Sequence, residues 1–188
     1  MSDTPIDVFI DLPSFPGPVQ AGRLWSHFRK GRESASFEYN KEWLANPHRF
    51  ALEPLLPLAD GTFHTNPGQS VFGAIGDSTP DRWGRILMRR AELARARTAN
   101  ESPHTLSELD YLLRVNDEAR QGALRFSQDG GQSFCAPPGS TPIPPLVNLS
   151  RLLHAADHFC RDDENAEDLR LLLAPGSSLG GARPKASV

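Results

Sequence analysis

Apolar and polar residues alternate along the first forty residues of the chain, which is the pattern of β-strands. Over residues 6–13 the apolar side chains recur at every second position, so this segment predicts a half-buried strand. A turn rich in proline and glycine leads to a second predicted strand over 19–28. The tight turn at 30–33 leads to a third strand over 34–40. Together the strands predict a small antiparallel meander.

The clearest helical pattern in the chain follows Pro80, which suits a first helical turn. Ser78 or Thr79 is expected to cap this helix. Asp81 favours the positive end of the helix dipole. The side chains expected in the core are Trp83, Ile86, Leu87, Ala91 and Leu93.

A second helix and a hairpin are predicted next. Thr105 and Glu108 have the spacing of a capping box, so a helix should follow. Residues 122–126 have the composition of a strand, and the turn at 129–131 leads into 132–136 to complete a hairpin. A short helical turn is also expected near Trp43.

The best candidate for a linker is the segment 136–145, in which five of ten residues are proline. Beyond it, apolar residues at helical spacing predict a helix over 148–160, and a shorter one over 168–174 is stopped by Pro175 and Gly176. The apolar positions of the longer helix are Leu149, Leu152, Leu153, Ala156 and Phe159. The order of strands, helices, hairpin and helices predicts the α+β class.

The composition is that of a globular protein, with 38% hydrophobic and 23% charged residues among 188. A net charge of −3 argues against strong binding to nucleic acid or to an anionic membrane. The acidic N-terminus lacks the features of a signal peptide, and no apolar run is long enough to cross a bilayer. Cys135 and Cys160 form no CxxC pattern, so we expect reduced thiols in a cytoplasmic protein.

Three groups of residues outside the C-terminal end could carry chemistry, and each has a simpler structural explanation. Six arginines between residues 82 and 97 could form a basic face for nucleic acid or an acidic partner, but a solvated helix face is favoured. His154 and His158 are spaced to share a metal, but no third ligand is evident, so helix histidines are favoured. Aromatic residues are expected to fill the core, although Trp25 and Phe37 could form a nucleic-acid platform. The expected core aromatics are Trp25, Phe37, Trp43, Phe50, Phe72 and Trp83.

The last thirteen residues, GSSLGGARPKASV, combine glycines with Arg183 and Lys185, which is a composition suited to phosphate binding. The spacing matches neither a Walker A loop nor a Rossmann fingerprint. On spacing alone, a flexible polar loop is the favoured interpretation.

Four stretches resemble, in the same order, the HipA family of bacterial serine/threonine kinases from type II toxin–antitoxin systems. They are FEYNKEWLANPHRFALEPLLPL, TPDRWGRILMRRA, YLLRVNDEARQGALRF and GSSLGGARPKA. The last stretch resembles the family's phosphate-binding loop. The resemblance runs from Val8 to Val188, which is nearly the whole chain.

The resemblance implies an N-terminal α+β subdomain over 1–140, with a small antiparallel sheet packed with helices. Residues 141–188 would be the helical start of a protein-kinase-like core. Ser178, with Ser177 as second choice, falls where the family carries an autophosphorylated regulatory serine. The residues that would line the phosphates of ATP are Gly180, Gly181, Ala182, Arg183, Pro184 and Lys185.

The resemblance also implies a function for the parent protein, which is Mg-ATP-dependent phosphorylation of protein serine or threonine in the translation machinery, such as aminoacyl-tRNA synthetases. The expected partners are a HipB-like helix-turn-helix antitoxin, through which DNA would be reached only indirectly, or the missing kinase core. No membrane partner is expected. Catalytic and metal-binding residues cannot be located, so we expect a truncated core that is inactive alone. The alternative is a non-catalytic binding subunit that pairs with and restrains a separately encoded HipA-like kinase core.

Overall fold

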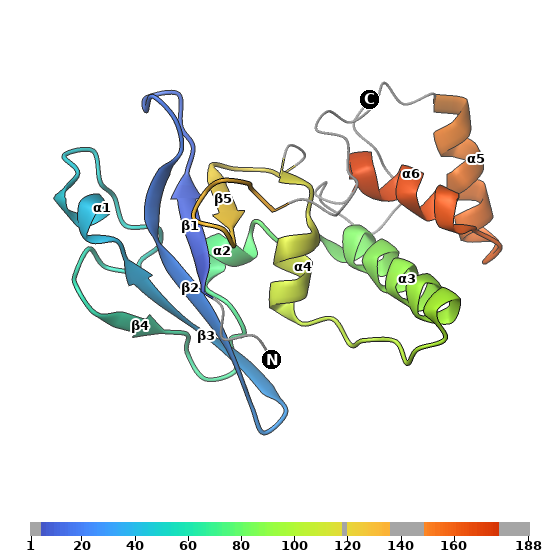
Figure 1. Cartoon of the computed structure of the whole chain (residues 1–188), viewed down its shortest axis with the longest axis horizontal. Coiled ribbons are helices and arrows are strands. Elements are labelled where there is room, and N and C mark those ends of the chain that lie inside the picture. The colour runs from blue at the N-terminus through green and yellow to red at the C-terminus, as the bar shows by residue number, and fades with distance from the viewer. Residues whose placement is uncertain (1–4, 118–119, 136–148, 177–188) are drawn as a thin grey trace. The chain divides into compact units, whose positions relative to one another are not determined.

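The computed structural model describes residues 5–117, 120–135 and 149–176 (Figure 1). These residues fall into two compact units. The first comprises the chain up to Ser78 together with Gly122–Cys135, and the second comprises Thr79–Gln121 and the helices after residue 148. The sequence predicted a boundary between two domains at residue 140. This boundary falls within residues 136–148, which lie outside the described part. It stays a prediction.

The first unit is built on an antiparallel sheet of five strands in the order β4-β3-β2-β1-β5. The strands are β1 Ile6–Ile10, β2 Val19–Arg29, β3 Arg32–Tyr39, β4 Thr62–His64 and β5 Leu124–Ser127. The predicted meander of β1, β2 and β3 is confirmed. The sheet is larger than predicted because β4 adds to one edge and β5 pairs with β1 on the other.

Strand β1 is buried along its whole length, so the prediction of a half-buried strand is wrong. Its neighbours β2 and β5 cover both of its edges. Asp7 lies on the polar side of the strand, where Gln20 and Arg23 donate hydrogen bonds to its Oδ1 at 2.6 and 2.9 Å. On the same side, Phe9 packs edge-on against Phe134 at 5.4 Å between ring centroids.

The opposite face of the sheet carries the core of the first unit. Val8, Leu24, Phe37 and Phe126 are buried there, together with residues from two short helices, α1 Lys41–Ala45 and α2 Gly73–Gly76. The sheet is tightly packed at Gly22, where an added Cβ would lie 2.2 Å from the carbonyl oxygen of Glu38. The core prediction is confirmed for four aromatics, Phe37, Trp43, Phe72 and Trp83, whereas Trp25 is half-buried and Phe50 is exposed.

The predicted hairpin after β5 does not form. Residues 132–135 are described and contain no strand, and β5 pairs with β1 instead. The chain turns through Asp129, whose side chain accepts hydrogen bonds from Ser127 and from the backbone of Ser133 at 2.7 and 2.9 Å. This side-chain turn competes with strand geometry and holds 129–133 as a loop.

In its described residues the second unit contains four α-helices, α3 Arg82–Ala99, α4 Glu108–Arg114, α5 Leu149–Cys160 and α6 Ala166–Gly176. Its main core consists of Trp83, Leu87, Leu152, Ala155, Phe159, Leu169 and Leu172. Helices α5 and α6 pack on one another and α6 packs on α3 (Figure 1). The strands all pair antiparallel and belong to the first unit, whereas the longer helices belong to the second, so the predicted α+β class is confirmed.

The helix caps differ from those predicted. Asp81, rather than Ser78 or Thr79, caps α3 and accepts a hydrogen bond from the backbone N–H of Gly84 at 2.9 Å. Helix α4 has a capping box, but it is formed by Ser107 and Asp110 and not by Thr105 and Glu108. Each cap therefore lies two or three residues later in the chain than the predicted cap.

The apolar stripes were only partly right. Leu93 of α3 and Leu149 and Leu153 of α5 are exposed, although all three were expected in the core. In α3 the buried face instead includes three residues that the prediction omitted, namely Met88, Glu92 and Ala96. Helix α6 also begins at Ala166 and continues to Gly176, so it is longer than predicted.

Candidate functional site

The predicted phosphate-binding loop follows directly on helix α6, which ends at Gly176. The loop residues lie outside the described part of the chain, so their assignment to ATP stays a prediction. They are Ser177, Ser178, Gly180, Gly181, Ala182, Arg183, Pro184 and Lys185. The structure describes the helical stem from which this loop departs.

The start of the stem is fixed by a reciprocal cap. Asn165 Oδ1 accepts hydrogen bonds from the backbone N–H groups of Glu167 and Asp168 at 2.8 and 3.0 Å. In return, Asp168 Oδ2 accepts one from the backbone N–H of Asn165 at 3.1 Å. These bonds satisfy donors that the first turn of a helix leaves unpaired. The sequence analysis missed this cap, although the spacing Asn-x-x-Asp was available as a signal.

The apolar side of the stem holds α6 in the core of the second unit. Leu169 and Leu172 are buried against residues of α3 and α5. In the same cluster Trp83 of α3 meets Phe159 of α5 edge-on, at 4.8 Å between ring centroids. Burial of side chains of this size stabilises the packing by about 1.5–3 kcal/mol each. Helix α6, which precedes the predicted loop, is therefore held in place by packing against α3 and α5.

A polar contact also joins α5 to α6. His158 Nδ1 lies 2.9 Å from Asp168 Oδ2, and this hydrogen bond raises the pKa of His158. Burial opposes ionisation of Asp168, but the bonds from His158 and from the Asn165 backbone outweigh it, so the pKa of Asp168 is lowered. The pair therefore favours a protonated imidazole beside a carboxylate.

The two histidines of α5 do not form a metal site with a third ligand. Their rings pack edge-on at 4.3 Å between centroids, and His158 is committed to Asp168. Within 5–117, 120–135 and 149–176, no three His, Cys, Asp or Glu side chains are grouped to hold a metal ion. Cys135 and Cys160 are both free thiols.

Arg90 links α3 to the turn between α5 and α6 through two ion pairs. Its guanidinium lies 2.5 Å from Asp162 Oδ1 and 2.7 Å from Glu164 Oε1. It also stacks over the ring of Phe159, with 4.2 Å between the guanidinium carbon and the ring centroid. The hydrogen bond to Glu164 raises the pKa of Arg90. This arginine has a structural role in the second unit.

Arg85 has a similar role between α3 and α4. Its two terminal nitrogens donate to the two carboxylate oxygens of Glu108 at 2.5 and 2.6 Å. The guanidinium lies over Tyr111, 4.6 Å from the ring centroid, and the bond to Glu108 raises the pKa of Arg85. A planar fork that binds both oxygens fixes geometry more strongly than a single ion pair.

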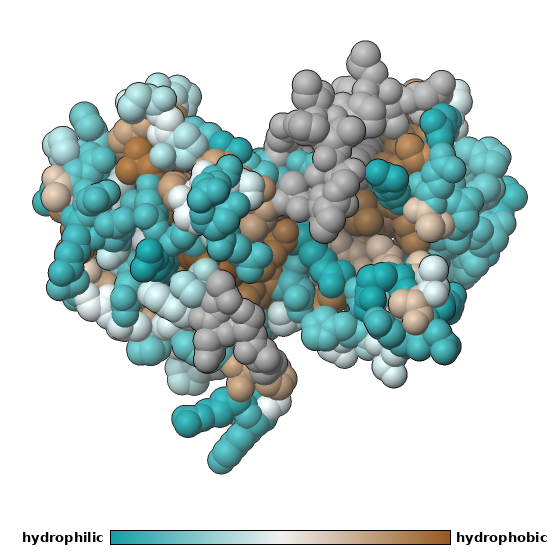
Figure 2. Space-filling model, in the orientation of Figure 1, coloured by the Kyte–Doolittle hydropathy of each residue, from teal (hydrophilic) through white to brown (hydrophobic). Residues whose placement is uncertain are grey.

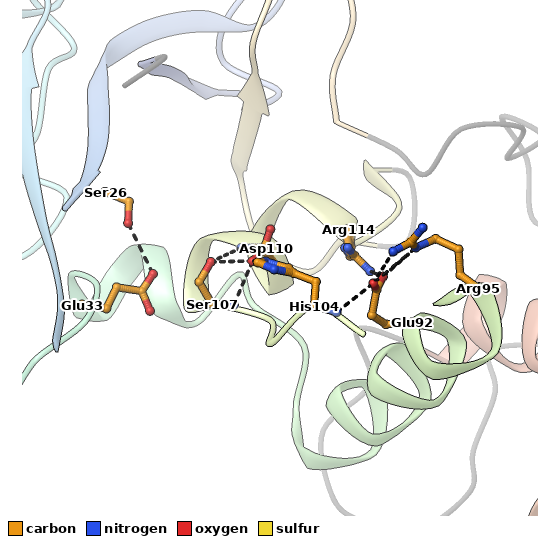
Figure 3. A network of polar contacts seen from close by, with 8 residues as sticks. All are labelled: Ser26, Glu33, Glu92, Arg95, His104, Ser107, Asp110 and Arg114. Carbon is orange, nitrogen blue, oxygen red and sulfur yellow. Dashed lines mark hydrogen bonds and ion pairs between the residues drawn. The ribbon is translucent and has the colours of Figure 1, made fainter. Parts of the chain in front are cut away.

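Glu92 is the centre of a polar network between α3 and α4 (Figure 3). Its side chain is only 3% exposed, and its oxygens accept hydrogen bonds from Arg95 at 2.8 Å, from Arg114 at 3.1 Å and from the backbone of His104 at 3.3 Å. The bond from Arg95 is the main reason that the pKa of Glu92 falls to about 2. A carboxylate that is ionised at neutral pH, and whose oxygens already accept hydrogen bonds from three partners, is a poor general base. This network is therefore structural.

The six arginines of α3 thus fall into two groups. Arg85, Arg90 and Arg95 pair with acidic residues, whereas the sequence analysis had favoured a solvated helix face for all six arginines. The other three, Arg82, Arg89 and Arg97, are exposed, and their side chains make no hydrogen bond or ion pair with a described residue. Among the aromatic candidates, Phe37 is fully buried and cannot stack on a nucleic acid.

No helix in the described part of the chain is both long enough and apolar enough to cross a membrane. The polar networks found there hold helices together, and the residues expected to contact ATP follow the last of these helices.

The comparison with known proteins supplies a family for this fold. The family model of the HipA N-terminal domain matches residues 17–127, which is more than half of the chain. The matched region runs from the start of β2 to the end of β5, so it covers most of the sheet together with α3 and α4. No curated protein matches the chain. The chain therefore belongs to the HipA N-terminal domain family, and this family indicates a HipA-like toxin context.

Proposed function

We propose that this chain is the N-terminal part of a HipA-like toxin, a serine/threonine protein kinase that transfers phosphate from ATP to protein serine or threonine. The observation that carries the proposal is the family match over 17–127, followed in the same chain by the glycine-rich sequence 176–188. Neither feature alone would suffice, because the loop spacing is not specific. Their order along one chain is what the family resemblance requires.

The proposal assigns a role to helix α6 as the stem of the phosphate-binding loop. Phosphoryl transfer depends on holding the phosphates still and on neutralising their charge. Lys185 and Arg183 would supply positive charge, and the glycines would leave backbone N–H groups free to face phosphate oxygens. Magnesium, when bound with ATP, would supply the remaining neutralisation. The cap at Asn165 and the buried leucines of α6 support the proposal, because they anchor the residues just before this loop.

The same loop would be the site of regulation. Ser178 is the first choice for autophosphorylation and Ser177 the second. A phosphate group adds about 1.5 to 2 negative charges, which would repel ATP from a loop that binds phosphates. The expected partners are a helix-turn-helix antitoxin, which would carry the complex to DNA, and a protein substrate in the translation machinery.

A second candidate is a non-catalytic subunit that binds and restrains a separately encoded kinase core. It is favoured by Leu149 and Leu153, which are exposed one helical turn apart on α5 and offer apolar area to a partner protein.

The two candidates are separated by a phosphorylation assay. The chain is supplied with a HipA-family kinase core, either joined to it or added separately, and incubated with Mg-ATP before the phosphorylated serine is mapped by mass spectrometry. We expect phosphate on Ser178 in the joined protein, loss of that phosphate in Ser178→Ala, and its retention in the control Ser177→Ala. Phosphate on neither serine, together with inhibition of the separate core by the added chain, would favour the binding subunit.

A further inference from the structure

The hairpin of β2 and β3 extends beyond the rest of the sheet. β1 pairs with β2 only as far as Leu24, and β4 pairs with β3 only over Ser36–Glu38. The pairing of β2 with β3 continues to Arg29 and Arg32. The result is a two-stranded ribbon over 26–35 that projects from the sheet (Figure 1). Apart from Ala35, whose backbone is hydrogen-bonded to Thr65, neither edge of the ribbon is paired with a further strand of the described chain.

The tip of this ribbon carries three unpaired cations. Arg29, Lys30 and Arg32 are exposed, and their side chains make no hydrogen bond or ion pair with a described residue. Arg29 and Arg32 lie directly opposite one another in the register. Like charges at opposed positions destabilise a strand pair. Folding therefore gains nothing from these side chains, whereas an anionic partner would relieve their repulsion.

An aromatic residue stands beside the cations. Phe28 is 54% exposed, which is far from the near-complete burial of the core aromatics. It lies opposite Glu33, the one acidic residue of the ribbon, and Ser26 Oγ donates a hydrogen bond to that carboxylate at 3.4 Å. Arg29 and Arg32 belong to the alternate face, because successive side chains of a strand point to opposite sides. In Figure 2 the end of the ribbon, at the bottom of the view, is hydrophilic, with a few more hydrophobic atoms beside it.

We propose that the tip of the β2–β3 hairpin, defined as Phe28 to Arg32, binds double-stranded DNA directly. The major groove of B-DNA, about 12 Å wide, admits a two-stranded β-ribbon. The three cations would contact phosphates at the groove edges, and Phe28 would make an apolar contact with base edges such as thymine methyl groups. This contact would exist without any antitoxin and does not depend on the proposed kinase function.

Double-stranded DNA fits these observations better than a single strand does. Binding of single strands relies on aromatic side chains that form a stacking surface along a basic groove. In the described residues Phe37 is buried, so the exposed aromatic of the hairpin is a single side chain at a narrow tip. The net charge of −3 on the whole chain opposes its approach to DNA, so the contact depends on a local cluster of cations such as this tip. The affinity should therefore be modest and strongly dependent on salt.

The proposal is tested by fluorescence anisotropy with the full chain and a labelled 20-base-pair duplex. Three phosphate contacts predict a slope of about −2.7 in log affinity against log salt, which is roughly a 40-fold loss of affinity from 50 to 200 mM. The variant Arg29→Gln/Lys30→Gln/Arg32→Gln should lose at least about tenfold in affinity at 50 mM salt and show a nearly flat slope. A hairpin variant that binds like the wild type would overturn the proposal.

The matched control is Arg82→Gln/Arg89→Gln/Arg97→Gln, which removes the same charge from exposed and unpaired positions of α3. It should change the affinity by less than about threefold, because it leaves the hairpin intact. If this control loses binding and the hairpin variant keeps it, the DNA contact belongs to α3 and the proposal is wrong. Circular dichroism of both variants should match the wild type, since all six side chains are exposed.

Two further measurements distinguish groove binding from simple charge attraction. Phe28→Ala should lower the affinity about threefold without changing the salt slope, because it removes an apolar contact and no charge. Double-stranded RNA, whose major groove is deep and narrow, and polyglutamate should both bind at least about tenfold more weakly than the DNA duplex. Equal binding of the RNA, of a single-stranded oligonucleotide or of polyglutamate would overturn the assignment to the DNA groove.

Discussion

Glu92 illustrates how a single charged residue can occupy a core position. The apolar stripe predicted for α3 included its neighbour Leu93, yet Leu93 is exposed and Glu92 is buried. The carboxylate is buried because Arg95, Arg114 and the backbone of His104 satisfy its oxygens. An unpaired carboxylate at this position would be strongly unfavourable. Its partners make Glu92 a polar connection between α3 and α4, in addition to the pair of Arg85 with Glu108.

Substitution of Glu92 should destabilise the second unit. Glu92→Gln removes the charge from a side chain that is 3% exposed, so Arg95 and Arg114 lose the carboxylate that they share. We expect the free energy of unfolding to fall by about 1–3 kcal/mol at pH 7, measured by urea denaturation. Glu101→Gln is the control, because Glu101 is exposed and contacts only the outer side of Arg95. It should change the free energy by less than about 0.5 kcal/mol.

The same contact has a definite pH dependence. The pKa of Glu92 is about 2 in the folded protein and lies near 4.5 without its partners. A depressed pKa gives stability that is fully present above pH 4.5 and is lost as the pH falls towards 2. The difference in unfolding free energy between wild type and Glu92→Gln should therefore shrink over that interval. A difference that stays constant down to pH 2.5 would contradict this account.

At the scale of elements, the packing of α5 on α6 combines apolar and polar contacts. Leu152 and Phe159 of α5 share a core with Leu169 and Leu172 of α6. Beside this core, His158 bonds to Asp168, the residue that also completes the cap of α6. The cap and the contact between the helices therefore depend on one carboxylate.

The contact between His158 and Asp168 should make the stability of the second unit depend on pH near neutrality. His158 has a raised pKa, so its contribution is complete below about pH 6.5 and is lost as the pH rises through the folded-state pKa. The neighbouring charges Asp157 and Asp163 act in the same direction. Unfolding free energies measured from pH 5.5 to 8.5 should fall more steeply in the wild type than in His158→Gln.

The control for this measurement is His64→Gln, at an exposed position of β4. It should leave the pH dependence between 5.5 and 8.5 unchanged. Equal slopes for the wild type and His158→Gln would show that the contact contributes no pH-dependent stability.

At the scale of the whole molecule, the periodicity of apolar residues predicted which helices and strands exist. It predicted less well where the helices begin and which strands pair. Alternation predicted β1, β2 and β3 because each has enough residues to show a period of two. β4 has three residues, too few for a pattern, and the pairing of β5 with β1 joins residues more than one hundred positions apart. The predicted caps were wrong because cap-type residues stand close together before α3 and before α4, and nothing in their spacing selects Asp81 or Ser107.

The family was predicted from a resemblance of motifs and is confirmed by the match to the HipA N-terminal domain. The phosphate-binding loop rests on the resemblance alone, because glycines with two cations have no spacing that specifies ATP. The cationic tip of the β2–β3 hairpin is different. Its residues were visible in the sequence, but only the strand register shows that they stand beyond the rest of the sheet.

The central claim is that residues 180–185 form one side of an ATP site completed by a kinase core. Calorimetric titration of Mg-ATP into the chain alone, and into the chain joined to a HipA-family kinase core, tests this claim most directly. The account predicts binding heat only for the joined protein, with binding weakened at least about tenfold by Lys185→Ala, which removes a charge from the phosphates. Tight binding by the 188-residue chain alone would contradict it. Binding by neither form would contradict the kinase assignment and favour the binding subunit.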